Sequence, residues 1–176
     1  KRVEVTLLDP DGQQVAQSEK TVAFAAGETS KKVDIAFDNL NDLRLWTAET
    51  PELYSVIVVQ KDASGAEEMA FNTQYGFRSI EIRNGQVLIN GKRVFFKGVN
   101  TQDTHPELGR TIDVPTMLKD ITLMKQANVN TVRTSHYPRQ AKMNAMFDYY
   151  GLYVMDEADL ECHKNWNDHG KNGGYN

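Results

Sequence analysis

The order of apolar segments in the second half of the chain limits its fold more than any other feature. Short apolar segments at 96–99, 131–134 and 152–155 are separated by two stretches with apolar residues at helical spacing. This order predicts three strands joined by two helices. Strands connected through a helix run parallel and cross over in the right-handed sense. The sequence therefore predicts either an open doubly wound sheet or the start of a (β/α)8 barrel.

Both predicted helices have recognisable boundary residues. Pro115 suits the first turn of a helix, where its missing N–H would be unpaired anyway, and Asn128 can close that helix. The second helix is predicted from Gln140 to Tyr150, stopped by Gly151. Each helix has one apolar face, formed by Met117, Ile121 and Met124 on the first and by Met143, Met146, Phe147 and Tyr150 on the second.

The connection after the first of these strands distinguishes the doubly wound sheet from the barrel. A nucleotide-binding sheet has a glycine-rich loop at this place, so that backbone amides can approach a phosphate. Residues 100–110 instead form a long polar segment with a single glycine, Gly109. Enzymes with a (β/α)8 barrel usually build their sites from such loops. We therefore predict the first β/α units of a TIM barrel.

Apolar and polar residues alternate with a period of two from Lys1 to about Ile82. Predicted strands cover residues 2–8, 33–37, 54–60 and 69–75, and turn signals lie at 9–12, 26–28 and 62–65. Short strands between turns, without a helical stretch, are typical of an antiparallel β-sandwich. The strand count is one or two short of a complete sandwich, and we expect the missing strands upstream.

A hairpin signal marks the change between the two patterns. The apolar residues 87–89 and 94–96 flank Asn90-Gly91, a pair that tolerates the positive φ angles of a tight turn. We therefore predict a β-sandwich domain over residues 1–82 and the N-terminal part of a TIM-barrel catalytic domain over residues 83–176.

Charge and composition exclude some partners. A net charge of −4 argues against general affinity for nucleic acid or anionic membranes. No apolar run approaches the length of a membrane span. The lone cysteine, Cys162, excludes an internal disulfide and does not indicate a compartment.

Polar residues with possible chemistry follow the second and third barrel strands. His136 follows one strand, and Glu161 and His163 follow the next, so parallel pairing would gather all three at one end. Two positions apart on an extended segment, Glu161 and His163 lie on one side and can share an ion, although two ligands do not complete a metal site. His136 has a simpler alternative, a hydrogen bond that caps the strand end.

Two adjacent carboxylates, Asp156 and Glu157, end the third strand. Neighbouring residues on a strand point to opposite faces, so this pair cannot flank one reacting bond. We expect the two residues to hold charge at the strand end, against Arg133 of the neighbouring strand.

Several segments of the chain resemble glycoside hydrolase family two. They are Phe96–Asn100, Val132–Pro138 and Tyr150–Ala158 in the second half, and Leu45–Tyr54 and Gly76–Arg78 in the first. The resemblance implies an immunoglobulin-like first domain joined to the barrel near Gly76–Arg78. It also implies retaining hydrolysis of terminal β-galactosides in carbohydrate metabolism.

The resemblance also implies roles for individual residues. His136 would contact the sugar and stabilise the transition state, and Arg133 would lower the pKa of the nucleophile's carboxylate. Glu161 and His163 would bind a Mg²⁺ ion beside the acid/base glutamate. The complete predicted substrate-binding set is Asn100, Gln102, Asp103, Arg133 and His136.

The loop after the first barrel strand departs from the family pattern. An Arg-His pair and an extra histidine of the family are replaced by Thr101, Gln102 and Thr104, while Asp103 and His105 are kept. Gln102 can hydrogen-bond a sugar hydroxyl but carries no charge. The aglycone preference and the strictness for galactose are therefore left open.

The catalytic carboxylates are expected outside this chain. Retaining hydrolysis needs two of them about 5 Å apart, an acid/base and a nucleophile. The resemblance places both glutamates after later barrel strands, so the chain alone would be inactive and would bind Mg²⁺ weakly or not at all.

Other functions remain open at this point. The chain could be a non-catalytic carbohydrate-binding or assembly module, or part of a family-two hydrolase for another sugar, such as a β-glucuronidase or β-mannosidase. Unpaired strand edges of a partial barrel would favour a homo-oligomer. A Gram-negative periplasm is compatible with the resemblance, but no residue indicates it.

Overall fold

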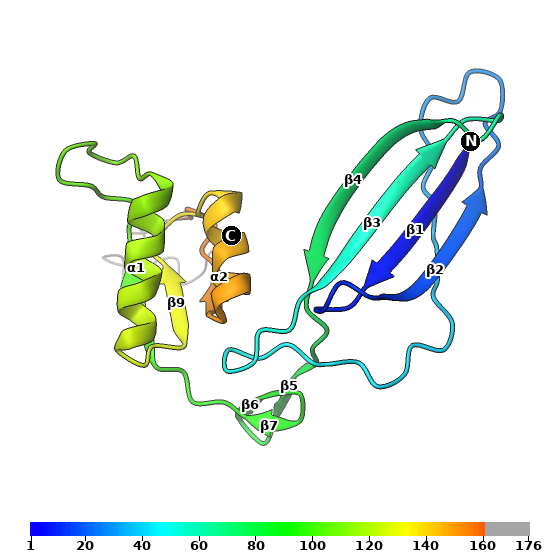
Figure 1. Ribbon diagram of the computed structural model, residues 1–176. Helices are drawn as coiled ribbons and strands as arrows, with labels where there is room; N and C mark the ends of the chain where they lie inside the picture. Colours follow the sequence, from blue (N-terminus) through cyan, green and yellow to red (C-terminus); the bar gives the residue numbers. More distant parts are fainter. Residues whose placement is uncertain (161–176) are drawn as a thin grey trace, which may run out of the picture. The chain divides into compact units, whose positions relative to one another are not determined.

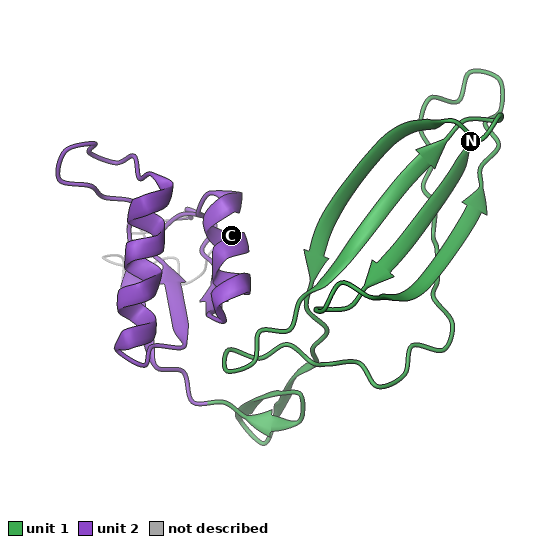
Figure 2. Ribbon diagram, viewed as in Figure 1, with its two compact units in different colours: residues 1–94 green, residues 95–176 purple. Residues whose placement is uncertain are grey.

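The chain divides into two compact units in a computed structural model, which describes residues 1–160. The units cover residues 1–94 and 95–176 (Figure 2). The sequence-based domain boundary after Ile82 stays a prediction. Among the described residues, no helix has both the length and the apolar character needed to cross a membrane.

A four-stranded antiparallel sheet dominates the first unit, in the order β2-β1-β3-β4 (Figure 1). The carboxylate of Asp9 holds the first turn by accepting hydrogen bonds from the backbone N–H groups of Asp11 and Gln13, both at 2.9 Å. Asp62 does the same in the second turn, accepting from Ser64 at 2.8 Å and Ala66 at 3.0 Å. The strands are β1 (Arg2–Leu8), β2 (Gln14–Thr21), β3 (Tyr54–Lys61) and β4 (Glu67–Tyr75).

The predicted strand at 33–37 is wrong, and residues 22–53 contain no strand. Val33, Ile35 and Phe37 are half-buried while the residues between them are exposed, so the alternation itself is real. Alternation makes a strand only where a neighbouring backbone offers hydrogen bonds, and no such neighbour lies along this segment in the described structure. The described part of the first unit therefore has one large sheet, not the two facing sheets of a complete sandwich.

Trp46 joins two distant segments of the first unit. Its side chain is buried, and its backbone N–H donates to the carbonyl of Phe77 at 2.8 Å. Gly76 allows this approach, because a Cβ there would lie 2.8 Å from the Trp46 Cβ. The side-chain amide of Asn90 donates to the Trp46 carbonyl at 3.1 Å. Segments 45–54 and 76–78 therefore lie against each other.

A small three-stranded sheet follows, with strands β5 (Ile80–Arg83), β6 (Gln86–Ile89) and β7 (Lys92–Arg93). The predicted Asn90-Gly91 turn is confirmed, with φ angles of 52° and 73°. The second strand begins at Lys92 and not at Val94, because a two-residue turn pairs Ile89 with Lys92. The sequence also holds a second Asn-Gly turn, at 84–85, that sequence reading overlooked.

Three parallel strands form the sheet of the second unit: β8 (Gly98–Thr101), β9 (Thr131–Thr134) and β10 (Tyr153–Met155). Their parallel order confirms the β-α-β-α-β prediction, although no closed barrel is present in the described residues. The first strand lies two residues later than the predicted 96–99. Asn130 explains the shift, because its side chain accepts from the Lys97 backbone at 2.8 Å and donates to the Phe95 carbonyl at 2.9 Å. Before β8, hydrogen bonds to the Asn130 side chain thus take the place of those to a neighbouring strand.

The two helices, α1 (Val114–Gln126) and α2 (Ala141–Tyr150), begin and end close to the predicted residues. Asp113 caps α1 by accepting the backbone N–H of Thr116 at 2.9 Å. Asn128 follows the end of α1 with a φ angle of 56°, and Gly151 closes α2 in the left-handed conformation.

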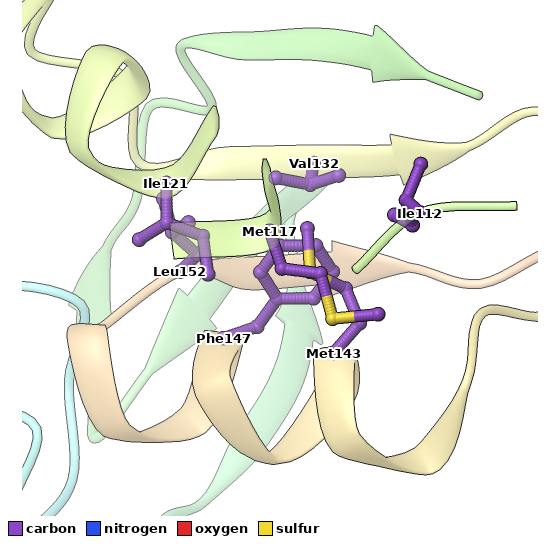
Figure 3. Packing of buried hydrophobic residues seen from close by; sticks show 7 residues of the cluster. All are labelled: Ile112, Met117, Ile121, Val132, Met143, Phe147 and Leu152. Atoms are coloured by element: carbon purple, nitrogen blue, oxygen red, sulfur yellow. The ribbon is translucent and has the colours of Figure 1, made fainter. Parts of the chain in front are cut away.

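One buried cluster joins the helices to the sheet. Figure 3 shows its side chains converging from α1, α2 and the strand β9. Each member is at most 6% exposed, and Ile121, Val132 and Phe147 are fully buried. Met124, Met146 and Tyr150 pack around the cluster, as their helical spacing predicted. The cluster consists of Ile112, Met117, Ile121, Val132, Met143, Phe147 and Leu152.

Phe147→Ala should strongly destabilise the second unit. Phe147 is fully buried at the centre of the cluster, and truncating such a side chain costs about 3–5 kcal/mol. Urea unfolding followed by circular dichroism measures the loss. Leu123→Ala is the matched control, because Leu123 is 53% exposed on α1 and its truncation should cost far less. Equal destabilisation by both changes would contradict the described packing.

Candidate functional site

Parallel pairing places three strand ends at one edge of the second sheet. Asn100 of β8 is paired with Arg133 of β9, and Met155 of β10 is paired with the same residue. The loops that follow these strands therefore start from a common edge. Such an edge of a parallel sheet is where ligand sites are usually built.

Glu157 is the centre of the polar contacts at this edge. One of its carboxylate oxygens forms an ion pair with Arg133, and the other lies 2.7 Å from His136 Nδ1. The backbone N–H of Glu157 donates to Thr134 Oγ1 at 2.9 Å, and this hydroxyl donates to Asp156 at 2.8 Å. The predicted ion pair between Arg133 and the strand-end carboxylates is confirmed, with Glu157 as the partner.

The contact with Glu157 determines how His136 presents its ring. A carboxylate can only accept, so His136 Nδ1 carries a proton. In the neutral ring the lone pair then lies on Nε2, where a donor such as a hydroxyl group can bind. The side chain of His136 is 43% exposed, which leaves it accessible to a ligand.

A second polar network links the end of β8 and its following loop to the loop after β9. Arg139 Nη1 lies 3.2 Å from Asp103 Oδ1, an ion pair without the alignment of a hydrogen bond. Its Nη2 donates to Thr101 Oγ1 at 3.0 Å and also contacts the Thr101 carbonyl. The guanidinium lies 4.7 Å from the centre of the Tyr137 ring, and the Asp103 backbone N–H donates to the Tyr137 hydroxyl at 2.9 Å.

The structure brings some of the predicted site residues together. Asn100, Arg133 and His136 lie at the common edge, and Gln102 is exposed in the loop after β8. Asp103 lies in the same loop, with its side chain only 14% exposed and its carboxylate facing Arg139.

The two predicted metal ligands, Glu161 and His163, lie outside the described residues. Within residues 1–160, no three His, Cys, Asp or Glu side chains lie close enough together to hold a metal ion.

Sequence reading missed the roles of Tyr137 and Arg139 and the full part played by Glu157. One usable signal for the Asp103–Arg139 pair was their opposite charge. Asp103 follows β8 and Arg139 follows β9, and these two strands are parallel neighbours. Glu157 was predicted to pair with Arg133, but its contact with His136 was not predicted, because it depends on how the loop after β9 turns.

The pairing of Glu157 predicts a specific loss of stability in acid. The hydrogen bond with His136, together with the charge of Arg133, lowers the pKa of Glu157. A group with a lowered pKa stabilises the fold above its unfolded-state value of about 4.3, and this contribution disappears as the pH falls through the folded value.

Glu157→Gln should therefore flatten the dependence of stability on pH below about pH 4.3. Urea unfolding at a series of pH values measures this. Glu107→Gln, an exposed carboxylate after β8, serves as the control and should keep the wild-type slope. An unchanged slope in Glu157→Gln would contradict the described pairing.

Curated relatives with the name β-galactosidase align with much of the chain. The protein from Photobacterium profundum is 46% identical over 132 residues, covering 74% of this chain and 13% of the relative. The protein from Alteromonas mediterranea is 41% identical over 165 residues, covering 86% of this chain and 16% of the relative. The chain thus spans less than a fifth of the length of these relatives.

Solved structures of two β-glucuronidases share the fold. The enzyme from Ruminococcus gnavus, in complex with D-glucuronic acid, has a TM-score of 0.77 and 27% identity, covering 90% of this chain and 25% of that chain. The Faecalibacterium prausnitzii β-glucuronidase has a TM-score of 0.74 and 33% identity, covering 89% of this chain and 24% of that chain.

Two family descriptions cover nearly the whole chain. Residues 1–78 match "Glycosyl hydrolases family 2", and residues 80–176 match "Glycosyl hydrolases family 2, TIM barrel domain". The second match explains the parallel β/α units as the beginning of a barrel, and the first covers the antiparallel sheet. The chain belongs to glycosyl hydrolase family 2.

Proposed function

We propose that the protein containing this chain is a retaining β-galactosidase, which hydrolyses terminal β-D-galactosides. The observation that carries the proposal is the Arg133–His136–Glu157 arrangement at the carboxyl edge of the parallel strands. The identity to relatives named β-galactosidase supports the choice of sugar. In this proposal the first unit is part of an immunoglobulin-like sandwich, and the second begins a closed TIM barrel.

His136 would recognise a sugar hydroxyl. Glu157 holds Nδ1, so the exposed Nε2 of the neutral ring is available to accept a hydrogen bond from a hydroxyl group. Such a bond contributes to catalysis when it strengthens as charge develops on the sugar ring in the transition state. Asn100 and Gln102 would add polar contacts from the loop after β8.

Arg133 would act through its charge. Its side chain is 38% exposed, although it is paired with Glu157. A positive charge at this edge lowers the pKa of any carboxylate that approaches, and the nucleophile of a retaining glycosidase must be ionised to attack. Arg133 would therefore keep that carboxylate in its reactive form. Both catalytic glutamates are proposed to lie elsewhere in the protein.

Glu161 and His163 are proposed as ligands of a Mg²⁺ ion. The carboxylate oxygen suits a hard cation, and Mg²⁺ commonly keeps several waters, so few protein ligands are needed. The ion would supply positive charge that positions and tunes the acid/base glutamate. The acid/base glutamate of the whole protein and water molecules would complete the coordination.

Hydrolysis of chromogenic substrates tests the function. The whole protein should cleave a nitrophenyl β-galactoside much faster than the matching β-glucuronide or β-mannoside, and the chain alone should cleave none of them. β-Glucuronidase is the second candidate, because the solved structures with this fold carry that name. Preference for the glucuronide would overturn the proposal in favour of that candidate, and activity of the isolated chain would overturn the location of the catalytic glutamates.

Magnesium removal tests the metal site in the whole protein. EDTA should lower kcat, and added Mg²⁺ should restore it. Glu161→Gln should raise the Mg²⁺ concentration needed for half-restoration about tenfold or more, because weakened coordination lowers metal affinity. Glu107→Gln is the control and should respond as the wild type does. If Glu161→Gln has the wild-type Mg²⁺ dependence, Glu161 is not a ligand.

A further inference from the structure

Arg139 is a charged residue buried in the second unit, 5% exposed overall. A guanidinium rarely loses its water unless other groups replace that hydration. Here the replacements are the Asp103 carboxylate, the hydroxyl and carbonyl of Thr101, and the face of the Tyr137 ring. A planar fork of donors fits this set, which a lysine ammonium could not satisfy in full.

These partners come from two neighbouring strand ends and the loops that follow them. Thr101 ends β8 and Asp103 lies in the loop after it, while Tyr137 and Arg139 lie in the loop after β9. Further contacts reinforce the link, because the Tyr137 hydroxyl accepts the Asp103 backbone N–H at 2.9 Å and the Ser135 hydroxyl donates to the Thr101 carbonyl at 3.4 Å. The end of β8 and the loop that follows it are therefore bound to the loop after β9 at two positions, 101 and 103.

Gln102 lies between these two fixed positions. Its side chain is exposed, while both of its neighbours are half-buried and held by Arg139. His136, three residues before Arg139, is fixed independently through Glu157. Arg139 therefore contacts the residues on both sides of the exposed amide, while Glu157 contacts the exposed imidazole.

We propose that Arg139 is a positioning residue for sugar recognition. It holds the Gln102 amide at a fixed place relative to His136, so that both can bind hydroxyl groups of the same substrate. The inference rests on the proposed function and adds to it a residue that acts through Gln102. Arg139 itself is too buried to contact the sugar.

Steady-state kinetics of the whole protein with a nitrophenyl β-galactoside test the inference. Arg139→Gln should raise KM about tenfold with a smaller change in kcat, because a displaced binding group loses substrate affinity. A purely structural role would reduce the amount of active enzyme and lower apparent kcat at constant KM. Arg83→Gln removes an exposed arginine of the first unit and is the matched control.

A double-mutant cycle identifies the group through which Arg139 acts. Gln102→Ala should raise KM, and Arg139→Gln should add little in that background. Additive effects of the two changes on KM would overturn the role of Gln102. If Arg139→Gln does not fold, Tyr137→Phe replaces it, because this change keeps the ring and removes the hydroxyl that accepts the Asp103 N–H.

Hydrogen exchange separates failure of this inference from failure of the proposed function. In the whole protein, Arg139→Gln should speed amide exchange in a peptide covering residues 101–110 and leave the peptide covering α1 unchanged. Unchanged exchange at 101–110 would overturn the positioning role, whatever the substrate. Faster exchange in a protein that hydrolyses no β-galactoside would support the positioning role and overturn only the assigned reaction.

Discussion

Parallel pairing of β8, β9 and β10 is the constraint on which the rest of the second unit depends. It sets Asn100, Arg133 and Met155 side by side and starts all three following loops from one edge. The pairing is possible because α1 and α2 fill the crossovers and bury one apolar cluster against β9 (Figure 3). Every polar contact of the candidate site depends on this register, since a shift of one residue would turn each side chain to the other face.

Two carboxylates at this edge form ion pairs that differ in burial. Asp103 faces Arg139, whose side chain is 1% exposed, whereas Glu157 pairs with Arg133, whose side chain is 38% exposed. Breaking a buried pair costs about 3–5 kcal/mol, while a more exposed pair contributes far less. The buried pair thus suits a scaffold that must not move. The exposed pair leaves a charge and an imidazole accessible to ligand.

Local signals made much of this unit predictable from sequence. Residues 131–134 form a strand as predicted, and local signals end both helices, Asn128 after α1 and Gly151 after α2. Predictions failed where the outcome depended on a distant partner. The strand at 33–37 needed a neighbouring backbone, and β8 was displaced by the side chain of Asn130. The Arg139 network likewise became visible only once the two loops were placed side by side.

Three carboxylates at this edge are each engaged by neighbouring side chains. Asp103 faces a guanidinium, Asp156 accepts from Thr134, and Glu157 is shared by Arg133 and His136. A general acid needs a raised pKa, whereas the pKa of Glu157 is lowered by its hydrogen bond to His136 and by Arg133. A nucleophile needs a free oxygen directed at the anomeric carbon, and both oxygens of Glu157 are occupied. In the reaction proposed above, both catalytic glutamates would therefore come from another part of the protein.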